Sequence, residues 1–428
     1  MKLIPETKLQ RIVIVGGGFG GITLAKKLNK KKFQVVMIDR NNYHTFQPLL
    51  YQVATGGLEP DSIAYPIRKI FPGKQNIIFR VAEALEAKIN ERVLVTDLGD
   101  LQYDHLVIAN GSTTNFFGNQ QIEQQAMTLK NVTGALDLRS LLLQNFEKVL
   151  IESDAEKRQK LMNIVIAGGG PTGVEIAGAL AELKRHVLPN DYPELDTKEV
   201  QIHVIESSDQ VLSSMSDQSS VKAKKFLEKM GVNIWLKTLV TEYRDEKVYL
   251  GNGKTIDCSA FIWTAGVKGN AIKGFPPSVF TEKGSRMKVD VYNRVTGIES
   301  LFAIGDAAAI IDEAHQHPHP MLAPVAIQQA KNLAHNLNIS DNEKWKRFHY
   351  FDKGSMATVG KNKAVADLGA FHFQGFFAWL VWMFIHLMSI AGFRNRLIIL
   401  INWVWNYFSY DRAIRLIIRP YKKKNGTQ

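Results

Sequence analysis

Two glycine-rich turns are the residues of this chain whose types and spacing could do chemistry. The pattern G-x-G-x-x-G occurs over Gly16–Gly21 and again over Gly168–Gly173. Such a turn lets the backbone approach a dinucleotide pyrophosphate, and the free N–H groups and dipole of the helix that follows favour the phosphates. One copy is a weak signal. Two copies predict that two dinucleotides bind at once, an arrangement suited to passing electrons between them.

The first turn lies in the strand–helix–strand context that the motif requires. Ile12–Val15 is a short apolar run typical of a strand buried on both faces, and Ile22–Leu28 has helical apolar spacing. Phe33–Ile38 predicts the next strand, which ends at Asp39. An acid at that strand end is placed to accept hydrogen bonds from a ribose. A glycine-rich turn without a ligand accounts less well for the strand, the spacing and the acid together.

The second turn has the same context with a longer spacing. Asn163–Ala167 predicts its first strand, and Val200–Ile205 predicts the second strand, which ends at Glu206. The acid is further from the turn than the usual ~20 residues, and a loop insertion at Pro189–Pro193 accounts for the difference. No Arg or Lys lies within Ser207–Asp209 to neutralise a 2′-phosphate, which favours NAD over NADP.

Two further acids have both a structural and a functional interpretation. Glu175 is either an acid stabilised by the helix dipole or a carboxylate beside the nicotinamide or the electron acceptor. We prefer the second interpretation, because helix N-termini in this type of fold face the ligand crevice. Asp306 follows a short strand that begins at Ser300, and it could bind a ribose or polyol or could simply cap a helix.

Three other segments could contribute to a site. Ala323–Ala330 predicts a helix whose alanines form one flat face. That face could receive an aromatic ring or could pack closely against another helix. Gln328 in this helix could donate a hydrogen bond to a carbonyl. Asp104–Ser112 and Phe261–Val267 are apolar strands that end in glycine turns, at the edge of a sheet where ligands bind. Tyr43–Gly57 is either a loop folded over a flat ring system or a packed surface loop.

Composition limits the other classes of function. The chain has 428 residues, which is long enough for two or three domains, and its net charge is +12. Its one cysteine, Cys258, cannot form an intrachain disulfide, so we expect a reducing compartment, and we predict that this residue is buried. Met1–Lys8 lacks an apolar segment, so we expect no secretory signal. Alternating histidines at His315–His319 suggest a metal, but prolines interrupt them and no acid or cysteine completes the set, so we predict a solvated loop.

The C-terminal segment combines apolar residues with basic ones. Gly375–Phe393 contains no Asp, Glu, Lys or Arg and is at the threshold of a membrane span. Arg412, Arg415 and Arg419 alternate with Ile and Leu, the pattern of a helix that lies in a membrane surface. A basic tail can also indicate nucleic acid or mere solubility, but four of the seven tryptophans lie in or beside it, which favours lipid, with Trp and Tyr at headgroup depth. A true span, a core helix pair and a dimer-forming helix pair remain alternatives, and a break at Gly392 favours lying on the surface.

Taken together, these residues resemble the type II NADH:quinone oxidoreductases, the single-subunit NADH dehydrogenases that do not pump protons. The resemblance covers nearly the whole chain. It is carried by Gly16–Gly21, Gln47–Pro60, Gly168–Glu175, Trp263–Val267, Phe302–Asp306 and His386–Arg396.

The resemblance implies an α/β fold with two Rossmann-like dinucleotide-binding domains, as in glutathione reductase, and a C-terminal helical membrane-anchoring segment. Non-covalent FAD is expected at the first turn and NADH at the second. The implied ranges are 1–120 with 297–372 for FAD, 121–296 for NADH and 373–428 for the membrane-associated helices. A homodimer is expected, attached peripherally to an anionic lipid surface on the cytoplasmic face of the inner (cell) membrane. Neither nucleic acid nor a metal is expected.

The family's quinone-site motif, Ala-Gln-x-Ala-x-Gln, is altered here. Pro324 replaces its first Gln, whereas Gln328 remains, and Asn110 stands where the family usually has Thr. The candidate residues are, for catalysis, Glu175, Gln328 and Lys361; for FAD, Gly16, Gly18, Gly20, Gly21, Asp39, Arg40, Gln52, Ser112, Gly305 and Asp306; for NADH, Gly168, Gly170, Gly173, Glu206 and Gly266; and for the quinone, Ala323, Ala326 and Gln328.

The predicted function is electron transfer from NADH through FAD to a membrane quinone. No chain of intramembrane carboxylates suggests a proton pump. The single cysteine excludes a disulfide reductase and a sulfide:quinone oxidoreductase. Two alternatives remain. One is an FAD-dependent enzyme that reduces a soluble electron carrier, which leaves the C-terminal segment unexplained. The other is an NADH-responsive flavoprotein that acts through partners.

Overall fold

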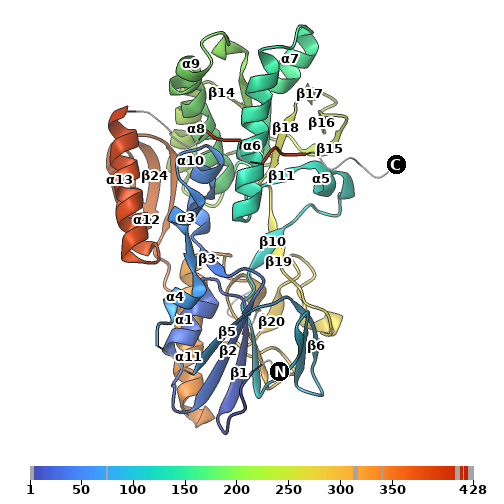
Figure 1. The fold of residues 1–428 in the computed structure, drawn as a ribbon, viewed down its shortest axis with the longest axis vertical. Helices are drawn as coiled ribbons and strands as arrows, with labels where there is room; N and C mark the ends of the chain where they lie inside the picture. The colour runs from blue at the N-terminus through green and yellow to red at the C-terminus, as the bar shows by residue number, and fades with distance from the viewer. Residues whose placement is uncertain are drawn as a thin grey trace. The chain divides into compact units, whose positions relative to one another are not determined.

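The computed structural model describes residues 4–73, 76–311, 317–339, 341–409, 415–417 and 419–422 (Figure 1). The chain divides into two compact units. Unit 1 consists of residues 1–44, 65–113 and 267–352, and unit 2 consists of residues 45–64, 114–266 and 353–428.

Unit 1 is built on a five-stranded parallel sheet in the order β21-β9-β1-β2-β5. Its strands are apolar because they are buried on both faces, as is usual for parallel sheets. They are β1 (Gln10–Val15), β2 (Phe33–Asp39), β5 (Ile77–Val81), β9 (His105–Ile108) and β21 (Leu301–Ala303).

Helices α1 (Phe19–Lys27) and α11 (Ala323–Asn338) cover one face of this sheet, where Leu24 and Leu333 join its core. Leu94 and Leu101, from a three-stranded antiparallel sheet, belong to the core of the opposite face. That second sheet consists of β6 (Ala84–Lys88), β7 (Val93–Thr96) and β8 (Gly99–Gln102).

Unit 2 repeats this plan. Its five-stranded sheet has the order β11-β18-β12-β13-β14, with β11 (Met127–Thr128), β12 (Asn163–Ala167), β13 (Gln201–Ile205), β14 (Val232–Trp235) and β18 (Ala260–Trp263). Its long helices are α6 (Val132–Val149), α8 (Pro171–His186) and α10 (Asp217–Lys229). The matching antiparallel sheet consists of β15 (Val240–Arg244), β16 (Lys247–Leu250) and β17 (Thr255–Asp257).

A third sheet and two helices complete unit 2. The antiparallel strands β23 (Ser355–Gly360), β24 (Lys363–Leu368) and β25 (Phe371–Gly375) pack between α8 and the pair α12 (Phe376–Ser389) and α13 (Phe393–Ser409). A side chain at Gly178 of α8 would collide with the carbonyl of Val359, so α8 and β23 pack at backbone distance. Gly392, with a φ of 85°, separates the last two helices as the sequence predicts.

Shorter elements connect these sheets. They are β3 (Tyr43–Thr45), η1 (Gln47–Leu49), α2 (Leu50–Ala54), α3 (Pro60–Ile63), β4 (Ala64–Pro66), α4 (Ile67–Ile70), β10 (Ser112–Thr114), α5 (Gln120–Gln125), α7 (Ala155–Met162), α9 (Leu188–Asp191), η2 (Thr197–Glu199), β19 (Val267–Gly269), η3 (Pro277–Val279), β20 (Met287–Val289), η4 (Gly305–Ala307), β22 (Ala308–Ile310) and η5 (Asn342–Lys344).

The predicted α/β fold with two Rossmann-like sheets is confirmed, and the prediction of a basic helix over 412–419 is wrong where the structure describes it. Arg412 lies outside the described residues. Residues 415–417 and 419 are not helical. Arg415 Nε lies 2.7 Å from the Asp191 carboxylate, and Arg419 donates to Asp137 over 2.6 Å. These arginines therefore pair with acids of unit 2 instead of lining one face of a helix.

Across the described part of the chain, no helix combines the length and apolarity that crossing a membrane requires.

Candidate functional site

The three glycines of the first turn have different physical roles. Gly16 has a φ of 111° and lies against the Ala109 carbonyl, and a side chain at Gly21 would collide with the carbonyl of Gly16. Gly18, in contrast, faces open space with no heavy atom within 4 Å of where a Cβ would be. Packing therefore requires the first and third glycines, while the second leaves room for a pyrophosphate to approach the backbone.

The second turn repeats these roles in unit 2. Gly168 has a φ of 107° and lies against the backbone of Ala265, and Gly173 lies against the carbonyl of Gly168. Gly170 faces open space, as Gly18 does. Both turns thus offer the same approach to a phosphate at the N-terminus of a helix.

A carboxylate at the end of the second strand holds each turn. Asp39 accepts hydrogen bonds from the backbone N–H of Gly17 at 2.6 Å and of Asn41 at 2.7 Å. Burial raises the pKa of Asp39 against the lowering effect of these two bonds. The remaining lone pairs of the carboxylate can accept a ribose hydroxyl.

Glu206 makes the same pair of bonds in unit 2. Its carboxylate accepts from Gly169 N at 2.5 Å and from Ser208 N at 2.8 Å. Burial acts to raise the pKa of Glu206, but the hydrogen bonds outweigh it and the pKa lies below its ordinary value. Glu206 follows β13 directly, and the inserted α9 and η2 occupy the extra sequence before that strand.

Other predicted residues of unit 1 meet around Asp306. The Ser112 hydroxyl donates a short hydrogen bond to the Asp306 carboxylate. Gly305 has a φ of 69°, and its N–H donates to Gln329 Oε1 at 2.6 Å. The Cβ of Ala326 packs against Gly305, leaving no room for a side chain there. Gln329 was not predicted, because periodicity does not decide which of two adjacent glutamines faces the turn.

The remaining predicted residues have varied surroundings. Arg40 is exposed beside Asp39. Gly266 in unit 2 accepts a backbone hydrogen bond from Asn115 at 3.0 Å. Gln52 belongs to unit 2, whereas the other residues predicted for FAD belong to unit 1.

One of the residues on α11 predicted to contact the quinone, Gln328, is hydrogen-bonded within unit 1. Both atoms of the Gln328 amide bond the backbone of Phe351, at 2.9 and 3.0 Å. Pro324 lies in the first turn of α11, where a helix does not need its N–H, so the departure from the family motif fits the helix. Ala323, Ala326 and Gln328 belong to unit 1, and Glu175 and Lys361 belong to unit 2.

Glu175 lines a pocket inside unit 2 with about 830 Å³ of empty space, part of it open to solvent. Residues of α2, α8, β23, α12 and α13 form its walls. We call it the aromatic pocket, because its walls include Tyr51, Trp379, Trp382, Trp403 and Tyr407.

Glu175 is buried, with 9% of its surface exposed. Burial raises its pKa to about 8, which favours the protonated carboxyl at pH 7, although a backbone hydrogen bond from Thr358 opposes the shift. The residue lies beyond the first turn of α8, which begins at Pro171, so the helix dipole does not explain an acid at this position. A protonated carboxyl in a pocket can donate a hydrogen bond or a proton to a bound acceptor.

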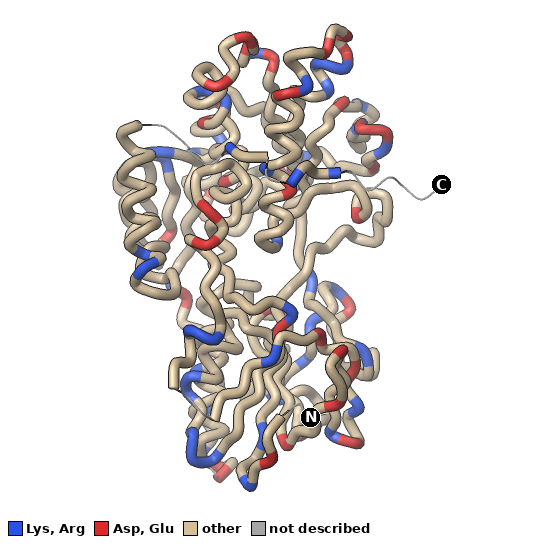
Figure 2. The backbone as a smooth tube through the Cα atoms, in the orientation of Figure 1, with Lys and Arg blue, Asp and Glu red and all other residues tan. Residues whose placement is uncertain are grey.

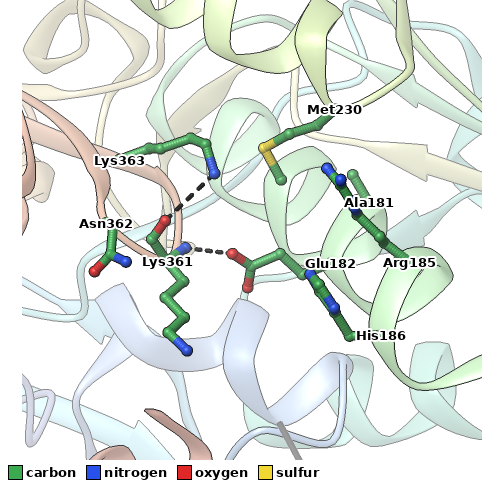
Figure 3. A pocket seen from close by; sticks show the side chains of 8 residues that line it. All are labelled: Ala181, Glu182, Arg185, His186, Met230, Lys361, Asn362 and Lys363. Atoms are coloured by element: carbon green, nitrogen blue, oxygen red, sulfur yellow. Dashed lines mark hydrogen bonds between the residues drawn. The ribbon is translucent and has the colours of Figure 1, made fainter. Parts of the chain in front are cut away.

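Lys361 connects this pocket to the surrounding elements. Its ammonium donates to the Tyr407 carbonyl and lies 4.1 Å from the centroid of the Tyr407 ring. Its backbone N–H donates to the carboxylate of Glu182 on α8, as Figure 3 shows. Lys361 thus brings a positive charge to the pocket that Glu175 lines.

The tryptophans of the last two helices differ in exposure. Trp382 and Trp403 are 2% and 8% exposed and line the aromatic pocket, whereas Trp405 is 62% exposed. Trp403 donates to Gln52 at 2.9 Å, and Trp382 stacks on His386 at 4.0 Å. Burial lowers the pKa of His386 to about 4, so this histidine is neutral at pH 7.

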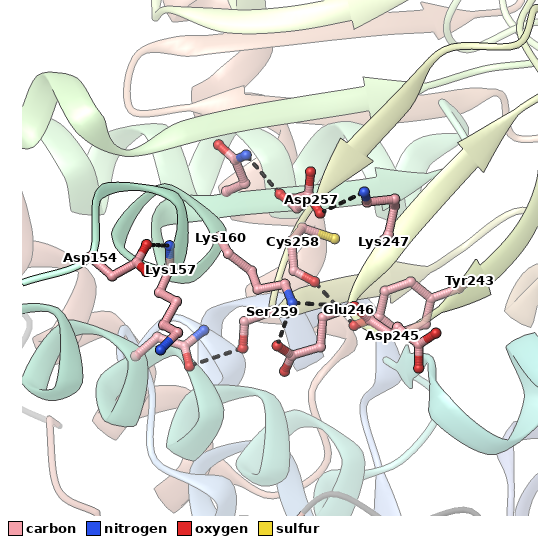
Figure 4. Close-up of polar contacts among 12 residues, drawn as sticks. Asp154, Lys157, Lys160, Tyr243, Asp245, Glu246, Lys247, Asp257, Cys258 and Ser259 are labelled. Carbon is pink, nitrogen blue, oxygen red and sulfur yellow. Dashed lines mark hydrogen bonds and ion pairs between the residues drawn. The ribbon is translucent and has the colours of Figure 1, made fainter. Parts of the chain in front are cut away.

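Cys258 is buried, as predicted, and its carbonyl accepts a hydrogen bond from Tyr243 at 3.1 Å (Figure 4). His315 lies outside the described residues. The ring of His319 packs against those of Phe348 and Tyr350. No group of three His, Cys, Asp or Glu that could hold a metal occurs in the described ranges.

Comparisons with known proteins agree with this geometry. Residues 10–330 match the family model "Pyridine nucleotide-disulphide oxidoreductase", and residues 352–410 match "NDH2 C-terminal domain". The chain is 33% identical to type II NADH:quinone oxidoreductase Ndh of Mycobacterium tuberculosis, over 94% of this chain and 89% of that protein. It is 28% identical to the mitochondrial internal alternative NAD(P)H-ubiquinone oxidoreductase A1 of Arabidopsis thaliana, over 96% and 86% of the two chains.

A solved structure of NDH2 from Plasmodium falciparum in complex with NADH has the same fold. It superposes with a TM-score of 0.87 at 21% identity and covers 96% of this chain and 100% of that one. Because the family models and the relatives span nearly the whole sequence, the chain belongs to the type II NADH:quinone oxidoreductases, membrane-associated flavoenzymes that pass electrons from NADH through FAD to a quinone without pumping protons.

Proposed function

We propose that the Gly16–Gly21 turn holds FAD and the Gly168–Gly173 turn holds NADH. The observation that carries this assignment is the repeated combination of an open second glycine and a carboxylate that holds the turn. Asp39 and the Ser112–Asp306 pair would hold hydroxyl groups of FAD, and Glu206 would hold the adenosine ribose of NADH. When bound, FAD supplies the two-electron redox chemistry between NADH and the quinone. We retain the ranges 1–120 with 297–372, 121–296 and 373–428 as the proposed functional domains; of these, residues 45–64 and 353–372 lie in unit 2 and residues 267–296 in unit 1.

The same carboxylate favours NADH over NADPH. Glu206 has a lowered pKa and is therefore charged at pH 7, and it would repel a 2′-phosphate. Its neighbours Ser207 and Ser208 offer no positive charge to compensate.

We also propose the aromatic pocket as the quinone site. A quinone is a flat apolar ring with two carbonyl oxygens, so it can pack against Trp382 and Trp403 while polar groups bind the oxygens. Neutral Glu175 would donate a proton to one oxygen, and the Lys361 ammonium would stabilise negative charge on the ring. Ala323, Ala326 and Gln328 belong to unit 1 and do not line this pocket, so their predicted quinone contacts stand as a separate proposal.

The outer faces of α12 and α13 are proposed to bind an anionic lipid surface on the cytoplasmic side of the cell membrane. Figure 2 shows few charged residues along these helices. Arg394 and Arg396, at the start of α13, would contact headgroups. The homodimer expected from the resemblance belongs to this proposal, and light scattering of the purified protein measures it. The exposed apolar side chains are Phe376, Phe377, Leu380, Phe384, Ile385, Met388, Phe393, Leu397, Leu400, Ile401, Val404, Trp405 and Phe408.

Valine at each open glycine tests the assignment of the two turns. Gly18 and Gly170 have φ values of −80° and −69°, so valine is tolerated by the backbone and blocks only the ligand. Gly18→Val is expected to lower the content of bound FAD about tenfold, measured by flavin absorbance, and Gly170→Val to keep FAD and raise the KM for NADH about tenfold. Each variant is the control for the other, and loss of FAD in Gly170→Val would contradict the assignment.

The preference for NADH is tested by comparing the two nucleotides. The kcat/KM for NADH is expected to exceed that for NADPH by at least about tenfold, and Glu206→Gln is expected to reduce this ratio because it removes the negative charge. Glutamine keeps an oxygen for only one of the two backbone N–H groups, those of Gly169 and Ser208, that bond the carboxylate. Equal kcat/KM values in the wild type would refute the role of Glu206.

Glu175→Gln tests the proton donor. Because neutral Glu175 is the active form, quinone turnover of the wild type is expected to fall as the pH rises through about 8. The Gln variant should lose about 10- to 100-fold in quinone turnover and should lack this pH dependence. Reduction of ferricyanide, which takes an electron and no proton, should stay unchanged and is the internal control.

Glu175→Gln should also change how the stability of the fold depends on pH. The raised pKa of Glu175 contributes stability that is fully present below the unfolded value of 4.5 and is lost as the pH rises through about 8, on the order of 5 kcal/mol in total. Denaturant unfolding of Glu175→Gln should lack this loss between pH 5 and 8. If the free energy of unfolding changed with pH in the same way in both proteins, the burial of a neutral carboxyl would be contradicted.

Membrane binding is tested by charges on the exposed face. Phe384→Glu with Trp405→Glu is expected to weaken sedimentation with vesicles that contain anionic lipid, because each charge must enter the apolar layer. Ile151→Glu, at an exposed apolar residue of unit 2 outside α12 and α13, is the matched control and should leave binding unchanged. Full vesicle binding by the double variant would overturn the proposed surface.

A further inference from the structure

Helix α8 presents a stripe of four residues to the aromatic pocket. Glu175, Ala179, Glu182 and His186 follow one another at intervals of four, three and four residues, so they lie on one face of the helix. All four line the aromatic pocket. The stripe begins at the buried Glu175 and ends in the last turn of the helix.

A second pocket meets the aromatic pocket at the outer end of this stripe. It has about 460 Å³ of empty space, and Figure 3 shows the residues that line it. Glu182, His186 and Lys361 line both pockets. Arg185, which lines only the second pocket, is exposed, so the second pocket is open to solvent. Titratable side chains therefore lie between solvent and the interior of the aromatic pocket.

The reaction needs such a connection. The balanced reaction is NADH + H⁺ + quinone → NAD⁺ + quinol, in which the hydride supplies two electrons and one hydrogen, and one proton comes from solvent. If Glu175 donates a proton to the quinone, its carboxylate must be reprotonated before the next turnover. Glu175 is only 9% exposed, and it shares the pocket with the indole rings of Trp382 and Trp403, which limits its direct contact with solvent.

We propose that Glu182 and His186 form the route by which protons from solvent reach Glu175, and this rests on the proposed role of the aromatic pocket. Glu182 lies about 10 Å along the helix from Glu175, a span that two or three hydrogen-bonded waters cover beside the small side chain of Ala179. The Lys361 N–H fixes the Glu182 carboxylate at this place. His186, one turn further, exchanges protons with solvent in the second pocket.

Other titratable and charged groups also face the route. Lys361 of the turn between β23 and β24, Tyr51 of α2 and Tyr407 of α13 face the aromatic pocket, and Arg185 and Lys363 face the second one. The proposal assigns proton transfer to Glu182 and His186, which continue the stripe that Glu175 begins. The tests therefore change these two residues and use Arg185, a neighbour on the same helix, as the control.

The activity test uses Glu182→Gln. Glutamine keeps an oxygen for the Lys361 N–H but cannot pass a proton on. Quinone turnover of the FAD-loaded enzyme is expected to fall about tenfold, with an increased solvent deuterium isotope effect and an unchanged KM for quinone. Ferricyanide reduction should stay at the wild-type rate, because that acceptor takes no proton. His186→Ala should behave alike and regain turnover with added imidazole, and Arg185→Gln should match the wild type.

A second measurement does not depend on turnover. Infrared difference spectra of the resting enzyme, with Glu175→Gln to identify the band, report how fast the neutral Glu175 carboxyl exchanges its proton for deuterium after transfer to D₂O. The exchange is expected to slow about tenfold in Glu182→Gln and to be unchanged in Arg185→Gln.

The outcomes separate this route from the proposed quinone site. Exchange and quinone turnover at wild-type values in Glu182→Gln would overturn the route and leave the quinone site intact. An equal loss of ferricyanide reduction would also overturn it, because the change would then be structural. Absence of the neutral carboxyl band in the wild type would instead refute the role of Glu175, and the route with it.

Discussion

The hydrogen bond between a strand-end carboxylate and the backbone of a glycine turn is the constraint on which both nucleotide sites depend. Asp39 and Glu206 accept from Gly17 and Gly169, and each uses its second oxygen for a backbone N–H two residues further along the chain. The turn is thereby fixed to the end of the second strand before any ligand arrives. Part of each acid's hydrogen-bonding capacity is used within the fold, and only the remainder is left for the proposed ribose contact.

The helices α12 and α13 combine two functions in their apolar surfaces. Trp382 and Trp403 line the aromatic pocket, whereas Phe384 and Trp405 are exposed. A helix that is apolar all round is usually buried on every side. Here one side of each helix covers the proposed quinone site and the other is proposed to meet lipid, so a quinone dissolved in the membrane would reach its site along helices that contact both.

The sequence allowed the two sheets and their turns to be predicted, because continuous apolar runs, glycine spacing and a terminal acid are local patterns. β1, β2, β12 and β13 all lie where those runs predict them. The surroundings of the C-terminal residues could not be predicted in the same way. Amphipathic spacing does not reveal which distant segment covers a side chain, and Arg415 pairs with Asp191, the last residue of α9, far earlier in the chain.

The aromatic pocket was missed for the same reason. Its walls come from α2, α8, β23, α12 and α13, which are separated by long stretches of sequence. Glu175 stood out by its place after the glycine turn, but its neutral state depends on burial that only the folded chain provides. Gln328 and Gln329 are adjacent, and only the structure shows that Gln329 holds Gly305 while Gln328 holds Phe351.

The order of strands along the chain has a consequence for how the protein is made. All five parallel strands of unit 2 lie between residues 127 and 263, whereas the sheet of unit 1 is incomplete until β21 (Leu301–Ala303) has been synthesised. At a synthesis rate of about 5–20 residues per second, the edge of β9 stays uncovered on the ribosome for roughly 10–40 seconds after β9 itself is made. The second sheet can form completely during that interval. The sheet of the later glycine turn can therefore be complete before that of the earlier one, and the unpaired edge of β9 is open to misassembly until β21 is made.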